Sequence, residues 1–183
     1  LGGLTVLHRN SGKMESFNQL NSQLVNENVY AILPDKGGNL LLGTLSALVS
    51  FNPEKKSFTT IDKEKDGTPF TSQRITILFR DSHKRLWVGG EEGISVFQQE
   101  GIEIEKGPIL PESSVTKTFT NCIYEAANGI IWVGTREGFY CFNEKEKKIK
   151  RYTTANGLPN NVVYGILEDT FGRLWVSTNR GIS

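Results

Sequence analysis

An excess of charge of one sign is what this sequence most clearly lacks. Its 183 residues hold 21 Lys and Arg against 20 Asp and Glu, which gives a net charge of +1. Nucleic-acid and anionic membrane surfaces attract proteins through clustered positive charge. The composition therefore gives no support for nucleic-acid binding by this segment, and we expect membrane contact only through other parts of a parent protein.

Long hydrophobic runs are also missing. The longest apolar stretch, residues 40–51, is interrupted by Gly43, Thr44 and Ser46 and is too short to span a bilayer. The first ten residues lack the basic and apolar regions of a signal peptide. Hydrophobic residues nevertheless make up 37% of the chain, and this is enough to build a folded core.

Motifs of catalytic and metal centres are absent from the sequence. It contains no HExxH, paired CxxC, Walker loop, GxSxG or GxGxxG pattern. His8 and His83 fall in or beside predicted turns, with no partner at metal-ligand spacing. We therefore expect no catalytic residues, no metal and no cofactor in this segment, and we do not expect it to be an enzyme.

An internal repeat is the strongest positive feature of the sequence. The stretches ILPDKGGNLLLGT, LFRDSHKRLWVGG, IYEAANGIIWVGT and ILEDTFGRLWVST align without gaps, at residues 32–44, 78–90, 123–135 and 166–178. One slot of the repeat holds Leu41, Trp87, Trp132 and Trp175, at steps of 46, 45 and 43 residues. A period of this length indicates a solenoid, a propeller or another repeat array.

Within each repeat the hydrophobic pattern has the period of a β-strand. In NVVYGILED, the alternation places Val163, Gly165 and Leu167 on one face and Tyr164 and Ile166 on the other. Three further short strands follow in each repeat, separated by polar or glycine-containing turns. Four antiparallel strands in about 45 residues are typical of a β-propeller blade.

The predicted fold is therefore an all-β propeller fragment with about four blade equivalents. It extends over residues 1–183, with approximate repeats at 3–46, 47–92, 93–137 and 138–180. The Trp of the second strand is expected to fill the space between neighbouring blades, because a single blade cannot bury both of its faces. Four blades are few for a closed ring, so we expect an open arc completed by the rest of the propeller or by a second copy of the chain.

Several recurring polar residues are most simply interpreted as structural. Asp35, Asp81 and Asp169 begin the first hairpin turn of a repeat, where an Asp side chain bonds its own backbone. Cys122 and Cys141 fall on the first and third strands of one blade, about 9–10 Å apart. That separation exceeds disulfide reach, so both are predicted to be free thiols.

The turn between the second and third strands is the best candidate for function. The position of this turn recurs in every repeat whereas its side chains differ, as expected where a scaffold presents binding residues on loops. In a propeller this turn shares one face with the loops that join the blades. The candidate ligand-binding residues on that face are Glu91, Arg136, Glu137, Asn156, Asn160, Asn161, Asn179 and Arg180.

The last repeat resembles that of the two-component regulator propeller family. The family pattern has a GLP-containing start, a DxxG-xLWxGT core and a closing Gly followed by an apolar residue, which correspond here to residues 157–162, 169–178 and 181–182. The first repeat departs from the pattern with Leu41 in place of Trp, the second lacks the turn glycine (Lys84) and the third lacks the Asp (Ala126).

The resemblance implies a context that the residues alone do not. Such repeats are similar to those in the periplasmic sensor regions of hybrid two-component histidine kinases of Bacteroides-type bacteria. The resemblance therefore implies a segment that binds a ligand, in many members an oligosaccharide, and passes the event on by conformational change.

Two other classes of function remain as alternatives. A propeller enzyme, such as a lyase or a quinoprotein, would need a cluster of His, Glu or metal ligands, and two non-repeating histidines argue against it. A scaffold propeller of the WD-repeat kind would carry GH and WD pairs, and the sequence has neither.

Overall fold

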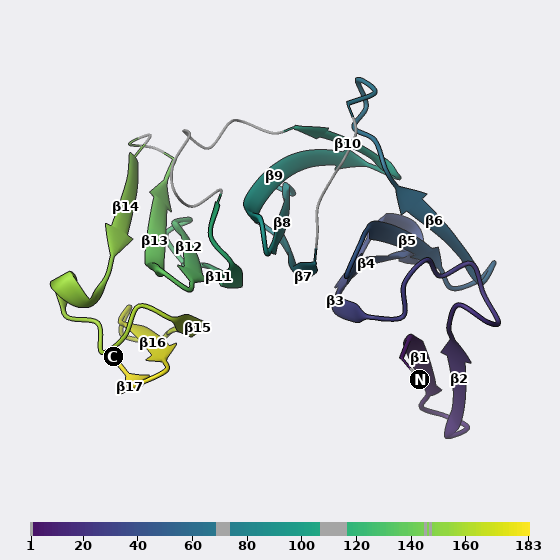
Figure 1. The fold of residues 1–183 in the computed structure, drawn as a ribbon, viewed down its shortest axis with the longest axis horizontal. Coiled ribbons are helices and arrows are strands. Elements are labelled where there is room, and N and C mark those ends of the chain that lie inside the picture. Colours follow the sequence, from purple (N-terminus) through teal and green to yellow (C-terminus); the bar gives the residue numbers. More distant parts are fainter. Residues whose placement is uncertain (1, 69–73, 107–116, 145, 147) are drawn as a thin grey trace.

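The computed structural model describes residues 2–68, 74–106, 117–144, 146 and 148–183. Its strands form five separate antiparallel sheets that follow one another along the chain, and we number them as blades 1 to 5. The blades stand side by side in an open arch, with both ends of the chain on its open side (Figure 1). The predicted all-β propeller fragment is confirmed.

Within each blade, neighbouring strands of the sheet are consecutive in the sequence. The sheets of blades 2, 3 and 4 have four strands each, the sheet of blade 1 has two and that of blade 5 has three. Blade 1 contains β1 (Leu4–His8) and β2 (Lys13–Phe17). Blade 2 contains β3 (Val29–Pro34), β4 (Leu40–Thr44), β5 (Leu48–Asn52) and β6 (Ser57–Ile61). Blade 3 contains β7 (Ile75–Arg80), β8 (Leu86–Gly90), β9 (Gly93–Glu100) and β10 (Glu103–Lys106).

Blade 4 contains β11 (Thr120–Glu125), β12 (Ile131–Thr135), β13 (Gly138–Asn143) and β14 (Lys148–Tyr152). Blade 5 contains β15 (Val163–Glu168), β16 (Leu174–Thr178) and β17 (Gly181–Ile182). The short 3-10 turns η1 (Lys36–Gly38) and η3 (Thr154–Asn156) lie in loops. Within the described residues, no helix has the length and apolar content needed to cross a bilayer.

The hydrophobic core lies between the blades. Between blades 3 and 4, Trp87 of β8 packs edge-on against Phe142 of β13, with ring centroids 5.8 Å apart. Leu41 takes the same position between blades 2 and 3 and packs with Phe97. Both Leu41 and Trp87 are buried, so the predicted role of this slot is confirmed at these two junctions.

The first strands differ from the simple alternation expected from sequence. Each has a register shift near its start, between the residue pairs 29/31, 75/77, 120/122 and 163/165. The extra residues are Tyr30, Thr76, Asn121 and Tyr164. The prediction that Val163, Gly165 and Leu167 share one uninterrupted face was therefore wrong, because a bulge at Tyr164 breaks the period of two.

Glycines of the second strands allow the blades to approach closely. A Cβ atom added to Gly43 would lie 2.6 Å from Ile75 Cγ2, and one added to Gly134 would lie 2.7 Å from Val163 Cγ1. In each case the contact is with the first residue of the next blade's first strand. The equivalent residue of blade 5 is Ser177, which pairs with Gly165, so there the small residue lies on the neighbouring strand.

We predict that Gly134→Ala destabilises the protein by about 1–3 kcal/mol, because the added methyl group would overlap both Cys122 within blade 4 and Val163 across the junction of blades 4 and 5. Ser177→Ala is the matched control, since it keeps a Cβ at the same position of blade 5 and should change stability much less. Chemical denaturation measures both. Equal stability of Gly134→Ala and the unmodified protein would contradict this packing.

Candidate functional site

We call one edge of the arch the upper edge. It is formed by the turns between second and third strands together with the residues that precede the first strands. In every blade with a described first strand, the turn donates a backbone hydrogen bond to the residue just before that strand. Examples are Glu91 N to Arg74 O at 3.4 Å and Arg136 N to Phe119 O at 3.2 Å. Leu45 and Asn179 make the same bond to Asn28 and Val162. The predicted binding turns are thereby held beside the inner strands of the arch.

The bulged residues connect neighbouring blades at this edge. Thr76 Oγ1 donates to Thr120 O at 3.3 Å, and Asn121 Nδ2 donates to Val163 O at 2.8 Å. Tyr30 instead places its ring 5.5 Å below the guanidinium of Arg74 on the next blade. The bulges therefore direct polar and aromatic side chains across the blade junctions.

Two arginines of the upper edge, Arg74 and Arg136, lie over aromatic rings and have no carboxylate partner among the described residues. The guanidinium of Arg136 lies 4.2 Å from the centroid of the Phe119 ring. Within the described part of the chain, Arg74, Arg136 and Arg180 make no ion pair, whereas Arg80, Arg85 and Arg173 of the opposite, lower edge all do. Arg9 is also unpaired but belongs to the lower edge. Arg74 further has a left-handed backbone, with φ of 49°.

The three asparagines predicted as ligand-binding residues stabilise the loop before blade 5 by accepting hydrogen bonds from its backbone. The side-chain oxygens of Asn156, Asn160 and Asn161 accept backbone N–H bonds from Thr153, Val162 and Thr154, at 2.8–3.0 Å. Their amide NH2 groups remain as possible ligand donors. The structure thus gives each asparagine a local structural role that the sequence-based assignment did not include.

The other predicted residues present side chains to solvent. Glu91, Arg136, Glu137, Asn179 and Arg180 are all exposed. Glu137 is 3.6 Å from Arg151 Nη2, and its backbone oxygen accepts from the same guanidinium. The upper edge therefore combines guanidinium, carboxylate, amide and aromatic groups on one strip of the surface, and it is our candidate site.

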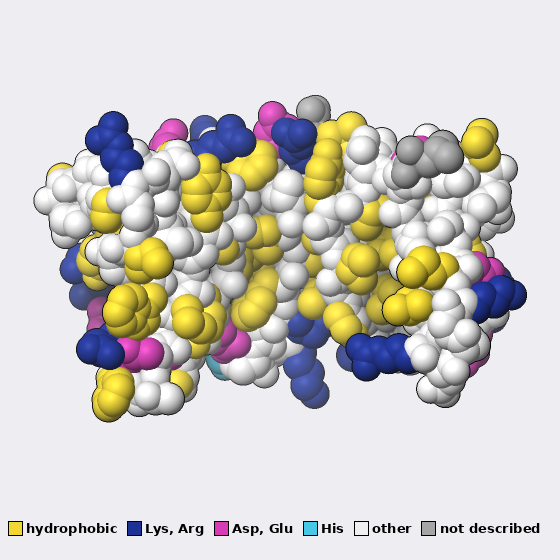
Figure 2. All heavy atoms as spheres, turned by 90° about the horizontal axis from the view of Figure 1, so that it is seen from below, with side chains coloured by type: hydrophobic (Ala, Val, Ile, Leu, Met, Phe, Trp, Pro, Cys, Tyr) yellow, Lys and Arg dark blue, Asp and Glu magenta, His cyan; other side chains and the backbone are white. Residues whose placement is uncertain are grey.

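Charged side chains lie mainly along the two edges of the arch. Figure 2 looks into its concave side and shows hydrophobic side chains across the middle, between the charged groups of the two edges. The described residues contain no group of three His, Cys, Asp or Glu side chains able to hold a metal ion. The candidate site is thus an extended polar strip beside a concave wall whose middle carries hydrophobic side chains.

A clamp on the second-strand Trp was missed by the sequence analysis. Asp81 accepts hydrogen bonds from Trp87 Nε1 at 2.8 Å and from Arg85 Nε at 2.6 Å. Asp169 does the same with Trp175 and Arg173, at 2.9 and 2.7 Å. A sequence signal for this clamp exists, namely the pattern D-x-x-x-R-x-W. It occurs in the two repeats that contain both the turn Asp and the second-strand Trp.

The clamp has electrostatic consequences. Hydrogen bonds from Trp175 and Arg173 lower the pKa of Asp169 to about 2. Arg85 extends from Asp81 to Glu144 of blade 4, at 2.8 Å, and so joins two blades. Asp81 and Asp169 also accept backbone N–H bonds within their turns, from Arg85 and Phe171, so the predicted turn-forming role is confirmed for these two. It was wrong for Asp35, which accepts no such bond from the described residues of its turn because its carboxylate binds the side chains of Arg80 and Gln99 in blade 3.

Further contacts join the blades at the lower edge. Arg80 binds Asp35 of the preceding blade at 3.0 Å. Glu125 accepts from the backbone N–H of Ser82, and Glu168 accepts from that of Ala127. All three residues end a first strand and contact the first turn of the preceding blade. The lower edge is therefore a set of structural cross-links.

The two cysteines are free thiols, as predicted. Burial raises the pKa of Cys122 to about 11, and burial also raises that of Cys141. Thiolate is the reactive form of cysteine. At neutral pH both side chains are therefore protonated and act as small core residues.

Comparison with known proteins agrees with the repeat architecture. Residues 113–137 and 157–180 match the sequence pattern of the two component regulator propeller family. The chain carries two-component regulator propeller repeats. It is also 30% identical over 172 residues to Histidine kinase P4 of Formosa agariphila, covering 90% of this chain and 12% of that protein.

Solved structures show the same fold. The extracellular domain of the B. thetaiotaomicron system BT4673 superposes with a TM-score of 0.80 at 22% identity, over 100% of this chain and 24% of that one. The extracellular domain of the hybrid two-component system BT3049 gives a TM-score of 0.71 at 20% identity, over 99% of this chain and 24% of that one. The chain thus spans about a quarter of these propeller structures.

We predict that Asp81→Ala destabilises the protein by about 3–5 kcal/mol, because it leaves a buried guanidinium and a buried indole N–H without their partner. Asp169→Ala removes the same bonds from the solvent-exposed clamp of blade 5 and should cost much less. Thermal and chemical unfolding compare the two. Similar losses for both variants would show that burial of the clamp is unimportant.

Proposed function

We propose that this chain is part of the periplasmic sensor region of a hybrid two-component histidine kinase and that its upper edge helps to bind an oligosaccharide. The support comes from the family repeats, the similarity to a histidine kinase and the fold shared with extracellular domains of such systems. The chain itself would then recognise the ligand and catalyse no reaction.

The arginines of the upper edge carry the proposal of a ligand site there. Arg74 and Arg136 stack on Tyr30 and Phe119 and have no carboxylate partner among the described residues. Sugars offer hydroxyl groups to charged side chains and apolar ring faces to aromatic ones, so a strip with both kinds of group suits them. Exposed Glu91 and Glu137 provide the matching acceptors.

The upper edge also contains hydrogen bonds through which ligand binding could change the angle between neighbouring blades. Thr76 and Asn121 bond to backbone oxygens of the following blade at this edge. A ligand that contacts the turns beside them would favour one angle between neighbouring blades over another. Binding energy that differs between two blade arrangements is what shifts such an equilibrium.

We predict that some member of an oligosaccharide panel raises the melting temperature of the protein, since a ligand that binds only the folded state stabilises it. Arg136→Ala should abolish that shift, because it removes an exposed guanidinium of the strip that lies over the Phe119 ring. Arg173→Ala is the control, being an exposed arginine of the lower edge.

Two results would contradict the proposal. If no oligosaccharide binds, even to a longer protein that contains the whole propeller, the scaffold alternative is favoured. If Arg136→Ala and Arg173→Ala weaken binding equally, the ligand does not bind at the upper edge.

A further inference from the structure

A groove of about 440 Å³ lies on the outer side of the arch, between blade 1 and blade 2. One wall is the end of β2, the outer strand of blade 1, and the other is the turn between β5 and β6 of blade 2 (Figure 1). The loop that connects the two blades closes the groove with residues 21–23. Strand β1 contributes no residue to these walls, and the volume lies in the range of small-ligand sites.

The loop of residues 18–28 repeats the hydrogen bonds of the loop before blade 5. Asn18 N donates to Asn21 Oδ1 at 2.8 Å, as Thr153 N does to Asn156 Oδ1 at 3.0 Å. The backbone N–H groups of residues 19 and 28 donate to the side chains of residues 27 and 26, and the later loop has the equivalent two bonds. This wall of the groove is therefore a folded loop that its own side chains hold in shape.

The loop has one residue more than its counterpart, and the addition lies at the groove. When the asparagines and the buried leucines of the two loops are aligned, Ser22 and Gln23 take the place of Gly157 alone. Ser22 Oγ donates to Asn18 O at 2.7 Å, so the loop itself uses this hydroxyl group. Gln23 is exposed and presents its amide to the groove.

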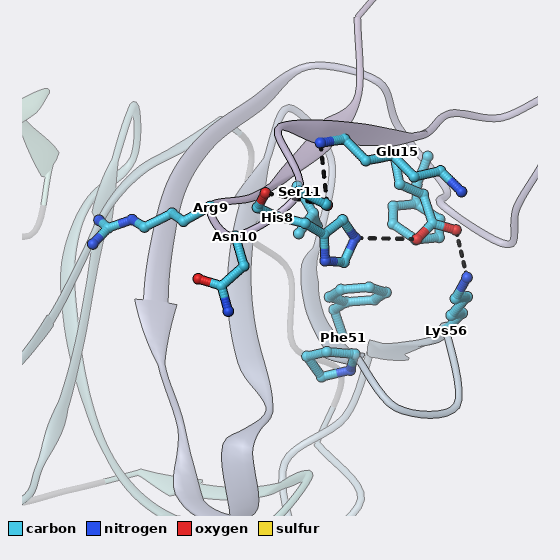
Figure 3. Close-up of a pocket in the computed structure, with 11 residues that line it drawn as sticks. His8, Arg9, Asn10, Ser11, Glu15, Phe51 and Lys56 are labelled. Atoms are coloured by element: carbon cyan, nitrogen blue, oxygen red, sulfur yellow. Dashed lines mark hydrogen bonds and ion pairs between the residues drawn. The ribbon is translucent and has the colours of Figure 1, made fainter.

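The opposite wall is held by an ion pair between the blades. Lys56 Nζ lies 2.6 Å from Glu15 Oε1, and His8 Nε2 lies 3.9 Å from the other carboxylate oxygen (Figure 3). The bond from Lys56 lowers the pKa of Glu15, so the carboxylate is ionised at neutral pH. Lys56 has a left-handed backbone with φ of 51°, at the turn position that Gly12 occupies in blade 1. The position favours glycine, and the lysine that occupies it supplies the bridge.

Three polar groups remain available inside the groove. Gln23, Lys55 and Ser57 line it, and their side chains make no hydrogen bond or ion pair with another described residue. Since the ion pair neutralises the other lysine of the lining, the charge of Lys55 is uncompensated there. The apolar residue of the lining, Phe17, is only 7% exposed. The groove therefore suits a hydrophilic anion rather than an apolar ligand.

We propose that the groove binds an acidic sugar, with a carboxylate or sulfate group on Lys55 and sugar hydroxyls on Gln23 and Ser57. An amide and a hydroxyl group both donate and accept hydrogen bonds, as sugar hydroxyls do, and the ammonium group adds a charge-assisted bond to the acid. The inference rests on the groove alone and not on the proposed site at the upper edge, so either can fail without the other.

Titration of the isotope-labelled protein with sugars at low salt, followed by NMR, tests the ligand class. Glucuronic acid or a glucose sulfate ester should shift the backbone amide signals of residues 21–23 and 55–57, and the tighter of the two identifies the acid group. Glucose is the neutral match and should bind at least about 10-fold more weakly, because it lacks the charge-assisted bond. No shift at these residues with either acid, or equal binding of glucose, would overturn the proposal.

Inorganic sulfate separates a sugar site from a simple anion site. It should bind more weakly than the sulfated sugar, because it cannot bond to Gln23 and Ser57 through sugar hydroxyls. Equal affinities would mean that the groove recognises the anion alone, and the proposal of a sugar site would be wrong.

Three variants locate the bound sugar. Lys55→Gln should weaken binding by about 10-fold or more, the loss expected for one hydrogen bond to a charged group. Lys36→Gln is the matched control, since this exposed lysine of blade 2 lies outside the groove lining, and it should leave the affinity unchanged. Arg136→Ala at the upper edge should also leave it unchanged. Circular dichroism and the melting temperature establish that each variant is folded.

Two patterns among the variants would contradict the assignment. Equal losses for Lys55→Gln and Lys36→Gln would show a general effect of charge. A loss with Arg136→Ala but not with Lys55→Gln would place the acidic sugar at the upper edge instead of the groove.

Discussion

Each sheet of the arch has two hydrophobic faces, and neither can be buried within its own blade. The packing of one sheet on the next is therefore the interaction on which everything else depends. It requires a large side chain such as Trp87 to enter the neighbouring blade and a missing Cβ such as that of Gly134 to let the strands approach. The cross-links of both edges then fix how neighbouring blades are placed.

The sequence was sufficient to predict the blades because their pattern is local. The period of two and the repeated turns specify strands over a few residues, and the recurring Trp slot specifies the inter-blade core. The bulges at Tyr30, Thr76, Asn121 and Tyr164 were not predictable in this way. The bulges occur where two blades pack together, and the alternation of hydrophobic residues within one strand does not encode contacts between blades.

The candidate site was predicted in position more successfully than in detail. The turn of Arg136 and Glu137 does lie beside the inner strands, as the propeller topology requires. By contrast, the oxygens of Asn156, Asn160 and Asn161 are engaged by the loop backbone. Arg74 and Tyr30 escaped notice because they become neighbours only when blades 2 and 3 pack together.

A double-mutant cycle on Trp87 and Phe142 tests the central claim most directly. The two rings lie 55 positions apart in the sequence and 5.8 Å apart in space, so only inter-blade packing can couple them. The account predicts that Trp87→Ala and Phe142→Ala are non-additive in the free energy of unfolding, by about 0.5–1.5 kcal/mol. Strictly additive losses would contradict the packing of one blade on the next as the source of stability.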